Sequence, residues 1–289
     1  MRCTSSRNVK WRLCLSTRTK DRMAKATIQL IYEDDDIIVI NKPTGVSVTA
    51  DRSGALELVH ILNRQLGLQK AGRLRLVHRL DKDTSGVMIL AKNVQAQSLF
   101  SAYFEKKLVK KTYLALVTGP LPAEQGVIDA PLEPSPGKPA LMCVARKKGK
   151  QAVTEWKLLA DFGTIALLAV YPLTGRTHQV RVHLAGIGLP LAIDPLYGDS
   201  KPLFLSNLKA DYRLGKNQLE KPLIERLTLH SYQIELLARP DNLPDCFIAP
   251  LDKKFAATLK MLAKYNPRGP EAFLNPDDFP AVISAKKLQ

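Results

Sequence analysis

Three segments of the chain combine acidic, basic and aromatic side chains at close spacing. The first, residues 76–86, reads LVHRLDKDTSG and places Asp81 between a basic pair and a Thr-Ser-Gly turn. A carboxylate on a short loop, kept ionised by nearby cations, can act as a nucleophile or a base. The structural alternative is a turn in which Asp81 or Asp83 accepts backbone hydrogen bonds. The segment alone leaves both interpretations open.

The second segment, residues 173–197, reads LTGRTHQVRVHLAGIGLPLAIDPLY and crowds two arginines and two histidines together. His178 and His183 are five positions apart, so they do not share a helix face as the two histidines of a zinc site would. Arg176 follows a glycine, and an arginine on a turn can hold a catalytic carboxylate or grip RNA through its planar fork. A surface ion pair is the structural alternative.

The third segment, KKTYLALV at residues 110–117, is a predicted strand with an aromatic residue, Tyr113, near its start. Most tyrosines in such strands are core residues whose hydroxyl finds a hydrogen-bond partner. Stacking of Tyr113 on a nucleic-acid base is the functional alternative.

Composition narrows the kind of partner. The 289 residues include 43 Lys and Arg against 27 Asp and Glu, a net charge of +16. This excess predicts a phosphate-rich partner such as a nucleic acid, or an anionic membrane surface. The longest apolar stretch, residues 164–173, is too short to cross a bilayer. The four cysteines show neither a C-x-x-C spacing nor a histidine at metal-ligand spacing, so we expect no disulfide framework, no zinc and a cytoplasmic protein with reduced thiols.

The elements that must position these residues are mostly strands. Helices are interspersed irregularly rather than in βαβα order, and no repeat of 20–50 residues is visible, which favours an α+β fold. The stretch PLEPSPGKP at residues 131–139 is predicted to be a loop, and residues 146–150 an exposed basic loop. Strands are predicted on both sides of an acidic turn at 33–36, and at 87–91, 111–117, 152–160, 164–170 and 227–236; helices are predicted at 54–69, 96–107 and 254–265.

The ends of the chain differ from its middle. Residues 1–25 are basic and rich in Ser and Thr; a disordered extension, a start of translation at Met23, a transit peptide and an RNA-binding arm all fit this composition. We favour the first two. Residues 26–266 are expected to form one catalytic domain, followed by a Pro-rich tail at 267–289.

Together these blocks resemble the RluA-type family of RNA pseudouridine synthases. HRLDKDTSG at 78–86 is similar to the HRLDxxTSG signature of that family, and GRTHQVRVHLAGIGLPLAIDPLYG at 175–198 to its second long motif. YEDDDIIVINKPTGVSV at 32–48 is similar to its opening, KTYLALV to its tyrosine motif, and LTLHSYQIEL near 227 to its last common strand. The five blocks keep the order of the family from about residue 32 to about residue 265. No segment before residue 32 is long enough for the S4-type domain of some relatives, so we expect a single-domain member.

The resemblance implies a role for each matching residue. Asp81 matches the catalytic aspartate, Tyr113 the tyrosine against the target uracil that is thought to help remove the C5 proton, and Arg176 the arginine that pairs with the aspartate. Arg79 matches an arginine inserted where the uridine has left the RNA, and Val180 an aliphatic residue beneath the uracil. His78, Lys111 and His178 are further candidates for contact with RNA. Asp194 follows Ile193 where many members have glycine, and we expect it to form a structural corner only.

The implied fold is a large mixed, mainly antiparallel sheet flanked by helices, with a central active-site cleft. The implied reaction converts uridine in rRNA or tRNA to pseudouridine by base flipping, an aspartate-dependent break of the N1–C1′ bond and rejoining at C5. We expect no cofactor, no metal, no membrane partner and a monomer. One alternative is a non-catalytic RNA-binding or chaperone protein with the same basic cleft. Another, a hydrolase that uses Asp81 and Asp83 as paired carboxylates, is disfavoured because side chains two positions apart diverge.

Overall fold

The apolar runs of the sequence form the strands of one large sheet. A computed structural model describes residues 27–49, 57–68, 74–215, 218–238, 243–266, 268, 273–275, 280–281 and 283. The expected extension at 1–25 and most of the tail expected at 267–289 lie outside these ranges. The described elements are β1 (Gln29–Glu33), β2 (Ile37–Lys42), α2 (Leu58–Gln65), β3 (Arg75–Leu76), β4 (Ser85–Ala91), α3 (Val94–Glu105), β5 (Val109–Thr118), β6 (Gln125–Asp129), β7 (Leu132–Ser135), β8 (Lys138–Val144), β9 (Val153–Asp161), β10 (Ile165–Pro172), α4 (Gln179–Gly186), the 3-10 helix η1 (Leu205–Asn207), β11 (Leu229–Leu236), β12 (Cys246–Ile248) and α5 (Lys253–Tyr265).

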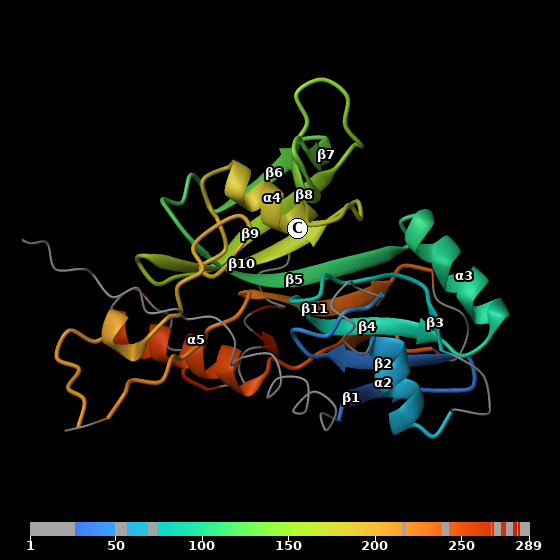
Figure 1. The fold of residues 1–289 in the computed structure, drawn as a ribbon, viewed down its shortest axis with the longest axis horizontal. Coiled ribbons are helices and arrows are strands. Elements are labelled where there is room, and N and C mark those ends of the chain that lie inside the picture. The colour runs from blue at the N-terminus through green and yellow to red at the C-terminus, as the bar shows by residue number, and fades with distance from the viewer. Residues whose placement is uncertain are drawn as a thin grey trace, which may run out of the picture.

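The main sheet has ten strands in the order β1-β2-β4-β11-β5-β10-β9-β6, with β3 also paired to β4 and β12 also paired to β11 (Figure 1). All of these pairs are antiparallel except that between β4 and β11. The expectation of a mixed, mainly antiparallel sheet flanked by helices is therefore confirmed. In the middle of the sheet, β11 brings the segment before β4 next to the start of β5, although the two lie far apart in sequence.

Helices cover both faces of the sheet. Alternate residues of β2 and β4 pack against α2 on one face and against α3 on the other, which explains why both strands are almost continuously apolar. Similarly, alternate residues of β10 pack against α4 and against α5. The predicted helices are confirmed with shifted ends; the start of the helix predicted from residue 54 lies outside the described residues.

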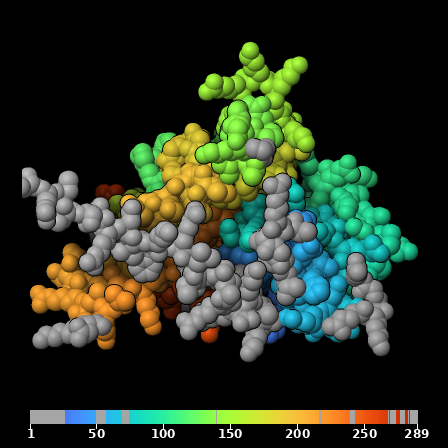
Figure 2. Space-filling model, viewed as in Figure 1, coloured from blue at the N-terminus to red at the C-terminus, as the bar shows by residue number. Residues whose placement is uncertain are grey.

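The segment at 131–139 is not a loop as predicted. Leu132–Ser135 and Lys138–Val144 form a separate antiparallel hairpin, β7–β8, which lies in the upper part of the molecule in Figures 1 and 2. The four prolines of this stretch suggested a loop, but a two-stranded ribbon has an unpaired edge on each strand, where a missing N–H costs no ladder bond. The basic stretch 146–150 that follows is exposed, as predicted.

Gly86 allows the parallel contact between β4 and β11. Its φ is +118°, and it is paired with Ser231, which in turn is paired with Tyr113 on β5. A Cβ atom at Gly86 would lie 2.0 Å from the Ser231 carbonyl oxygen and 2.6 Å from its nitrogen. The two backbones therefore meet at a distance that only glycine permits.

Replacement of Gly86 by alanine should lower the free energy of unfolding by about 3 kcal/mol or more, since backbone atoms must move to admit the methyl group. The matched control is Gly137→Ala, because Gly137 also has a positive φ, +72°, but its Cβ would meet open space. That variant should lose only about 1–2 kcal/mol of left-handed strain. Urea unfolding of both variants measures the difference, and equal losses would contradict the close approach.

Candidate functional site

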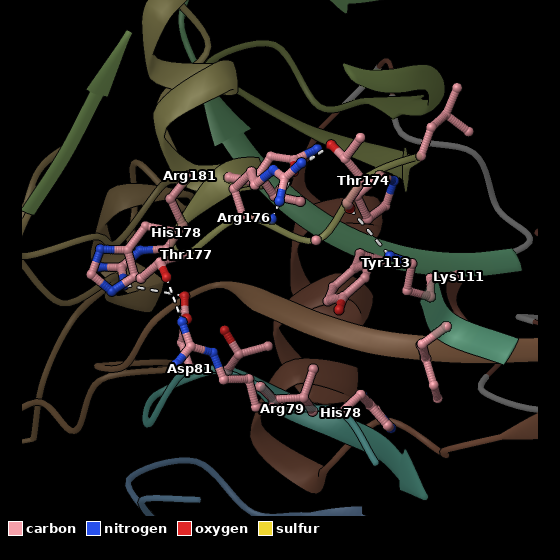
Figure 3. Close-up of a pocket in the computed structure, with 18 of the residues that line it drawn as sticks. His78, Arg79, Asp81, Lys111, Tyr113, Thr174, Arg176, Thr177, His178 and Arg181 are labelled. Carbon is pink, nitrogen blue, oxygen red and sulfur yellow. Dashed lines mark hydrogen bonds and ion pairs between the residues drawn. The ribbon is translucent and has the colours of Figure 1, made fainter. Parts of the chain in front are cut away.

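A cavity of about 510 Å³ opens where the segment before β4, the start of β5, the end of β10 and the start of α4 meet. This volume lies within the range of about 300–1,000 Å³ that is usual for ligand sites. All eight residues singled out from the sequence line it: His78, Arg79, Asp81, Lys111, Tyr113, Arg176, His178 and Val180 (Figure 3). Arg181, Thr174 and Thr177 line it as well.

The loop that carries Asp81 is hydrogen-bonded to the last residue of β2 and to the residues that follow it. The amide of Gly45 and the ammonium of Lys42 donate hydrogen bonds to the Lys82 carbonyl at 2.9 and 2.8 Å. The Thr44 hydroxyl donates to the Asp83 carbonyl at 2.7 Å. The sequence NKPTG thus forms a cradle for the backbone just after Asp81, which leaves the Asp81 carboxylate directed at the cavity (Figure 3).

Lys42 is completely buried within this cradle. Its ammonium also donates to the Pro43 carbonyl at 3.0 Å. Burial lowers the pKa of Lys42 to about 7, although the negative charges of Asp83 and Asp81 partly oppose that shift.

Arg181 is the arginine that faces Asp81. It is 3% exposed, and its Nε and Nη2 donate to the two carboxylate oxygens of Asp194 at 2.8 and 2.7 Å. Its Nη1 lies 3.6 Å from Oδ2 of Asp81. Burial lowers the pKa of Arg181, but the hydrogen bond and charge of Asp194, with a contribution from Asp81, outweigh burial and raise it. Arg181 is therefore a fixed cation shared by two carboxylates.

The predicted pairing of Arg176 with Asp81 is wrong. Arg176 is exposed, and its Nε donates to the Gln151 carbonyl at 3.0 Å. The reason is where α4 begins: buried Gln179 accepts from the Arg176 amide at 3.0 Å and donates to Val153 and Thr154 of β9. The helix therefore starts after Arg176, which stays on the rim, and turns Arg181 inward.

Asp194 is more than the structural corner expected from the sequence. It is fully buried, and besides Arg181 its Oδ1 accepts the backbone amides of Leu196 and Tyr197 at 2.9 and 3.2 Å. The signal that could have revealed the pair is the pattern QVRVHL, in which a single arginine lies between valines, so that its helix is apolar around it. A buried arginine of this kind requires a carboxylate partner.

Arg79 and Val180 both line the cavity, one exposed and the other buried. Nη2 of exposed Arg79 donates to the Thr177 hydroxyl at 2.5 Å and so spans the mouth of the cavity between its two loops. Val180 is buried in the cluster formed by α4 and β10, and Tyr113 packs at the edge of the same cluster. Figure 3 shows Tyr113 across the cavity from Asp81.

Burial sets the charge states of three further lining residues. It raises the pKa of Tyr113 to about 12, with the charge of Asp81 adding to the shift and a hydrogen bond with Ser231 opposing it, so Tyr113 is a phenol at neutral pH. Burial lowers the pKa of Lys111 to about 8, and this side chain donates to the Thr174 carbonyl at 3.2 Å. Burial also lowers the pKa of His78 to about 3; its Nε2 accepts the Ile89 amide and its ring stacks on Phe104, so it is a neutral wall of the site.

The described residues contain no group of three or more His, Cys, Asp or Glu arranged to hold a metal ion. None of the helices in the described ranges is long and apolar enough to span a bilayer. The centre of the cavity thus combines the Asp81 carboxylate with the buried guanidinium of Arg181, beside the neutral side chains of Tyr113, His78 and Val180.

Comparison with known proteins identifies the family. Residues 36–186 match the family model described as RNA pseudouridylate synthase. The chain belongs to this family. The matched region contains Asp81, Tyr113 and Arg181, and Asp194 follows shortly after it.

Curated relatives and solved structures agree with this assignment. The chain is 40% identical over 221 residues to ribosomal large subunit pseudouridine synthase D of Nitrosomonas europaea, covering 75% of this chain but only 62% of the relative. It is 38% identical over 230 residues to an uncharacterised RNA pseudouridine synthase of Zymomonas mobilis, covering 78% of this chain and 95% of that protein. The structure of human RNA pseudouridylate synthase domain containing 4 matches with a TM-score of 0.63 at 26% identity, over 85% of this chain and 97% of that one. The fold is therefore the α+β pseudouridine synthase fold.

The two arginines of the site should differ sharply in stability experiments. Arg181→Met leaves buried Asp194 without its counter-charge, which should cost about 3–5 kcal/mol of the free energy of unfolding. Arg176→Met removes one hydrogen bond at the surface and should change it by at most about 1 kcal/mol. Denaturant unfolding at one pH measures both values, and similar small losses would show that Arg181 is not the buried partner.

Lys42 should make stability depend on pH. Its pKa is about 7 in the folded protein against 10.5 in the unfolded chain, so the unfolded chain binds more protons between these values. The free energy of unfolding of the wild type should therefore rise with pH in this window relative to that of Lys42→Met. Paired urea titrations at several pH values measure this difference, and a difference that is constant from pH 7 upward would refute the lowered pKa.

Proposed function

We propose that this protein isomerises a specific uridine in structured RNA, rRNA or tRNA, to pseudouridine. The observation that carries the proposal is the half-exposed carboxylate of Asp81 at 3.6 Å from buried Arg181, in a cavity walled by Tyr113 and Val180. A carboxylate beside a buried guanidinium, in a cavity that can admit a flat ring, suits chemistry at a glycosidic carbon.

The reaction breaks the N1–C1′ bond of uridine and forms a C5–C1′ bond, while C5 loses a proton and N1 gains one. No atom is added to the nucleotide overall, so the reaction itself consumes no co-substrate. Asp81 attacks the nucleotide or stabilises positive charge that develops at the sugar. One carboxylate suffices because uracil leaves as a delocalised anion and needs no second acid to protonate an oxygen.

Tyr113 contributes to the site as a neutral ring. With a pKa of about 12, its phenol is a weak acceptor for the C5 proton unless its own proton moves first. The hydroxyl of Ser231, already hydrogen-bonded to it, and the carboxylate of Asp81, whose charge it senses, are its polar neighbours. In this proposal Tyr113 packs on the uracil from one side and Val180 from the other.

Access to the cavity requires base flipping, which costs a few kcal/mol of unstacking. Arg79 at the mouth is placed to enter the gap left by the uridine, and its bond with Thr177 keeps it there before RNA arrives. His78, Lys111 and His178 complete the wall that faces the flipped nucleotide.

The RNA backbone is held by the positive surface around the cavity. Lys107 lines the cavity, and exposed Lys106 and Lys110 flank it in sequence. The exposed Arg146, Lys147 and Lys148 follow the β7–β8 hairpin. Clustered cations of this kind bind phosphates by releasing counterions, so binding should weaken as salt rises.

The proposed substrate class follows the relatives, several of which are named ribosomal large subunit pseudouridine synthase C or D. Because the residues lining the cavity all come from one chain, we propose that a monomer is sufficient. Action in the cytoplasm, where ribosomal and transfer RNA are found, completes the proposal.

The decisive experiment is pseudouridine mapping by carbodiimide-dependent reverse-transcription stops on unmodified rRNA and tRNA. RNA incubated with wild-type protein should show a new stop at one or a few uridines, and RNA incubated with Asp81→Asn should show none. The substitution removes the carboxylate charge at nearly constant volume, so both proteins should bind RNA.

Equal RNA binding without a stop for either protein would favour a non-catalytic RNA-binding protein instead. A stop produced equally by Asp81→Asn would show that Asp81 is not the essential carboxylate.

A further inference from the structure

Tyr197 occupies a position between the β7–β8 hairpin and the candidate catalytic residues. It comes three residues after Asp194, and the resemblance to the family assigned it no role. Its side chain is half-buried. Its hydroxyl accepts the backbone N–H of Met142, on hairpin strand β8, at 2.8 Å. The same hydroxyl is hydrogen-bonded to Nδ1 of His178 at 2.8 Å. One oxygen atom thus joins the hairpin to the wall of the cavity.

The Tyr197 residue also contacts Arg181, His178 and Asp194, which lie near Asp81. The guanidinium carbon of Arg181 lies 5.1 Å from the ring centroid, within the range of a cation–π contact. The ring of His178 meets it edge-on at 5.6 Å. Its backbone amide donates to Asp194, the carboxylate that grips Arg181. Tyr197 therefore touches the residues that orient Asp81, but it does not line the cavity itself.

The hairpin is attached to the rest of the molecule through a small contact. Leu132, Ala152 and Val182 form a separate apolar cluster, against which Met142 and Tyr197 pack. Val182 is the neighbour of Arg181 on α4. The hairpin therefore packs against the same helix that carries this arginine. The hairpin lies in the upper part of the molecule, far from β1 and β2 (Figure 1).

His178 needs such a restraint. It has a φ of +53° at the N-terminus of α4, a left-handed conformation that is unfavourable for a residue with a Cβ atom. Burial lowers its pKa, while the charges around it, Asp81 and Asp194 against Arg181 and Arg79, act in opposite directions. The bond to Tyr197 fixes the ring of this strained residue from outside the cavity.

We propose that Tyr197 is a positioning residue that couples the β7–β8 hairpin to Arg181 and His178, so that RNA seated on the hairpin sets the geometry around Asp81. The inference rests on the proposed function, because it assumes that the basic stretch after the hairpin binds RNA. Tyr197 acts through its neighbours and does not touch the substrate.

The first test is Tyr197→Phe, which keeps the ring over Arg181 and removes only the hydroxyl. The rate constant of pseudouridine formation at saturating RNA should fall by roughly 10- to 100-fold, as expected for a small misplacement of reacting groups. RNA affinity and the thermal midpoint should stay close to those of the wild type. The matched control is Tyr232→Phe, because the Tyr232 hydroxyl is buried without a hydrogen-bond partner, and its rate should not change.

The second test asks whether the hairpin acts through Tyr197. The combined variant Arg146→Ala, Lys147→Ala and Lys148→Ala should lower both RNA affinity and the rate constant at saturation. In the Tyr197→Phe background the same three changes should lower affinity alone, so their effects on the rate constant should not add. Additive effects on the rate constant, or an unchanged rate in Tyr197→Phe, would overturn the coupling.

A third measurement does not depend on activity. Hydrogen exchange at the Met142 amide should be slow in the wild type and in Tyr232→Phe, and faster in Tyr197→Phe, which lacks its acceptor. Equal exchange in all three proteins would overturn the link between hairpin and cavity. If the wild type makes no pseudouridine, the proposed function fails, while this exchange pattern still reports on the link by itself.

Discussion

Arg181 is buried between two carboxylates, and the parts of the site are organised around it. A guanidinium removed from water is costly unless a partner satisfies its donors, and Asp194, itself fully buried, accepts hydrogen bonds from two of its three nitrogens. The remaining nitrogen is directed at Asp81, at a distance longer than that of the Asp194 bonds. The strong pair fixes the arginine, and the longer contact places its charge beside Asp81 without engaging both oxygens of that carboxylate. Because its two carboxylate partners differ in burial and distance, one arginine can both be anchored in the core and present a charge to the cavity.

The sheet positions Asp81 and Tyr113 relative to each other. The parallel contact of β4 with β11, which depends on Gly86, places the Asp81 loop beside the strand that carries Tyr113. The cradle after β2 then fixes the loop backbone through carbonyl acceptors and not through the carboxylate, so Asp81 keeps its acceptor capacity for the cavity. Hydrogen bonds to the backbone thus hold the Asp81 loop and leave the Asp81 carboxylate to its contact with Arg181.

Burial determines which side chains in and around the cavity carry a charge. Within the cavity, His78 and Tyr113 are neutral because burial disfavours their charged forms, whereas Arg181 stays charged because Asp194 pairs with it. Cations that bear no such cost lie at the rim and around the hairpin, where water solvates them and phosphates can reach them. An anionic polymer would therefore be attracted to the surface, while a flat uncharged base suits the interior. The link through Tyr197 joins these two regions, since it connects the hairpin to the buried arginine.

The sequence by itself determined the family, the strand-rich fold and most of the site. Asp81 and Tyr113 could be identified because each lies in a short, continuous motif that resembles one of the family. Tertiary structure decided which arginine faces Asp81, since Arg176 and Arg181 share one motif and only the anchoring of Gln179 by β9 sets where α4 begins. It also gave Asp194 its role and made a hairpin of a Pro-rich stretch. Burial and pairing between distant segments are properties of the folded chain, and no local pattern specifies them.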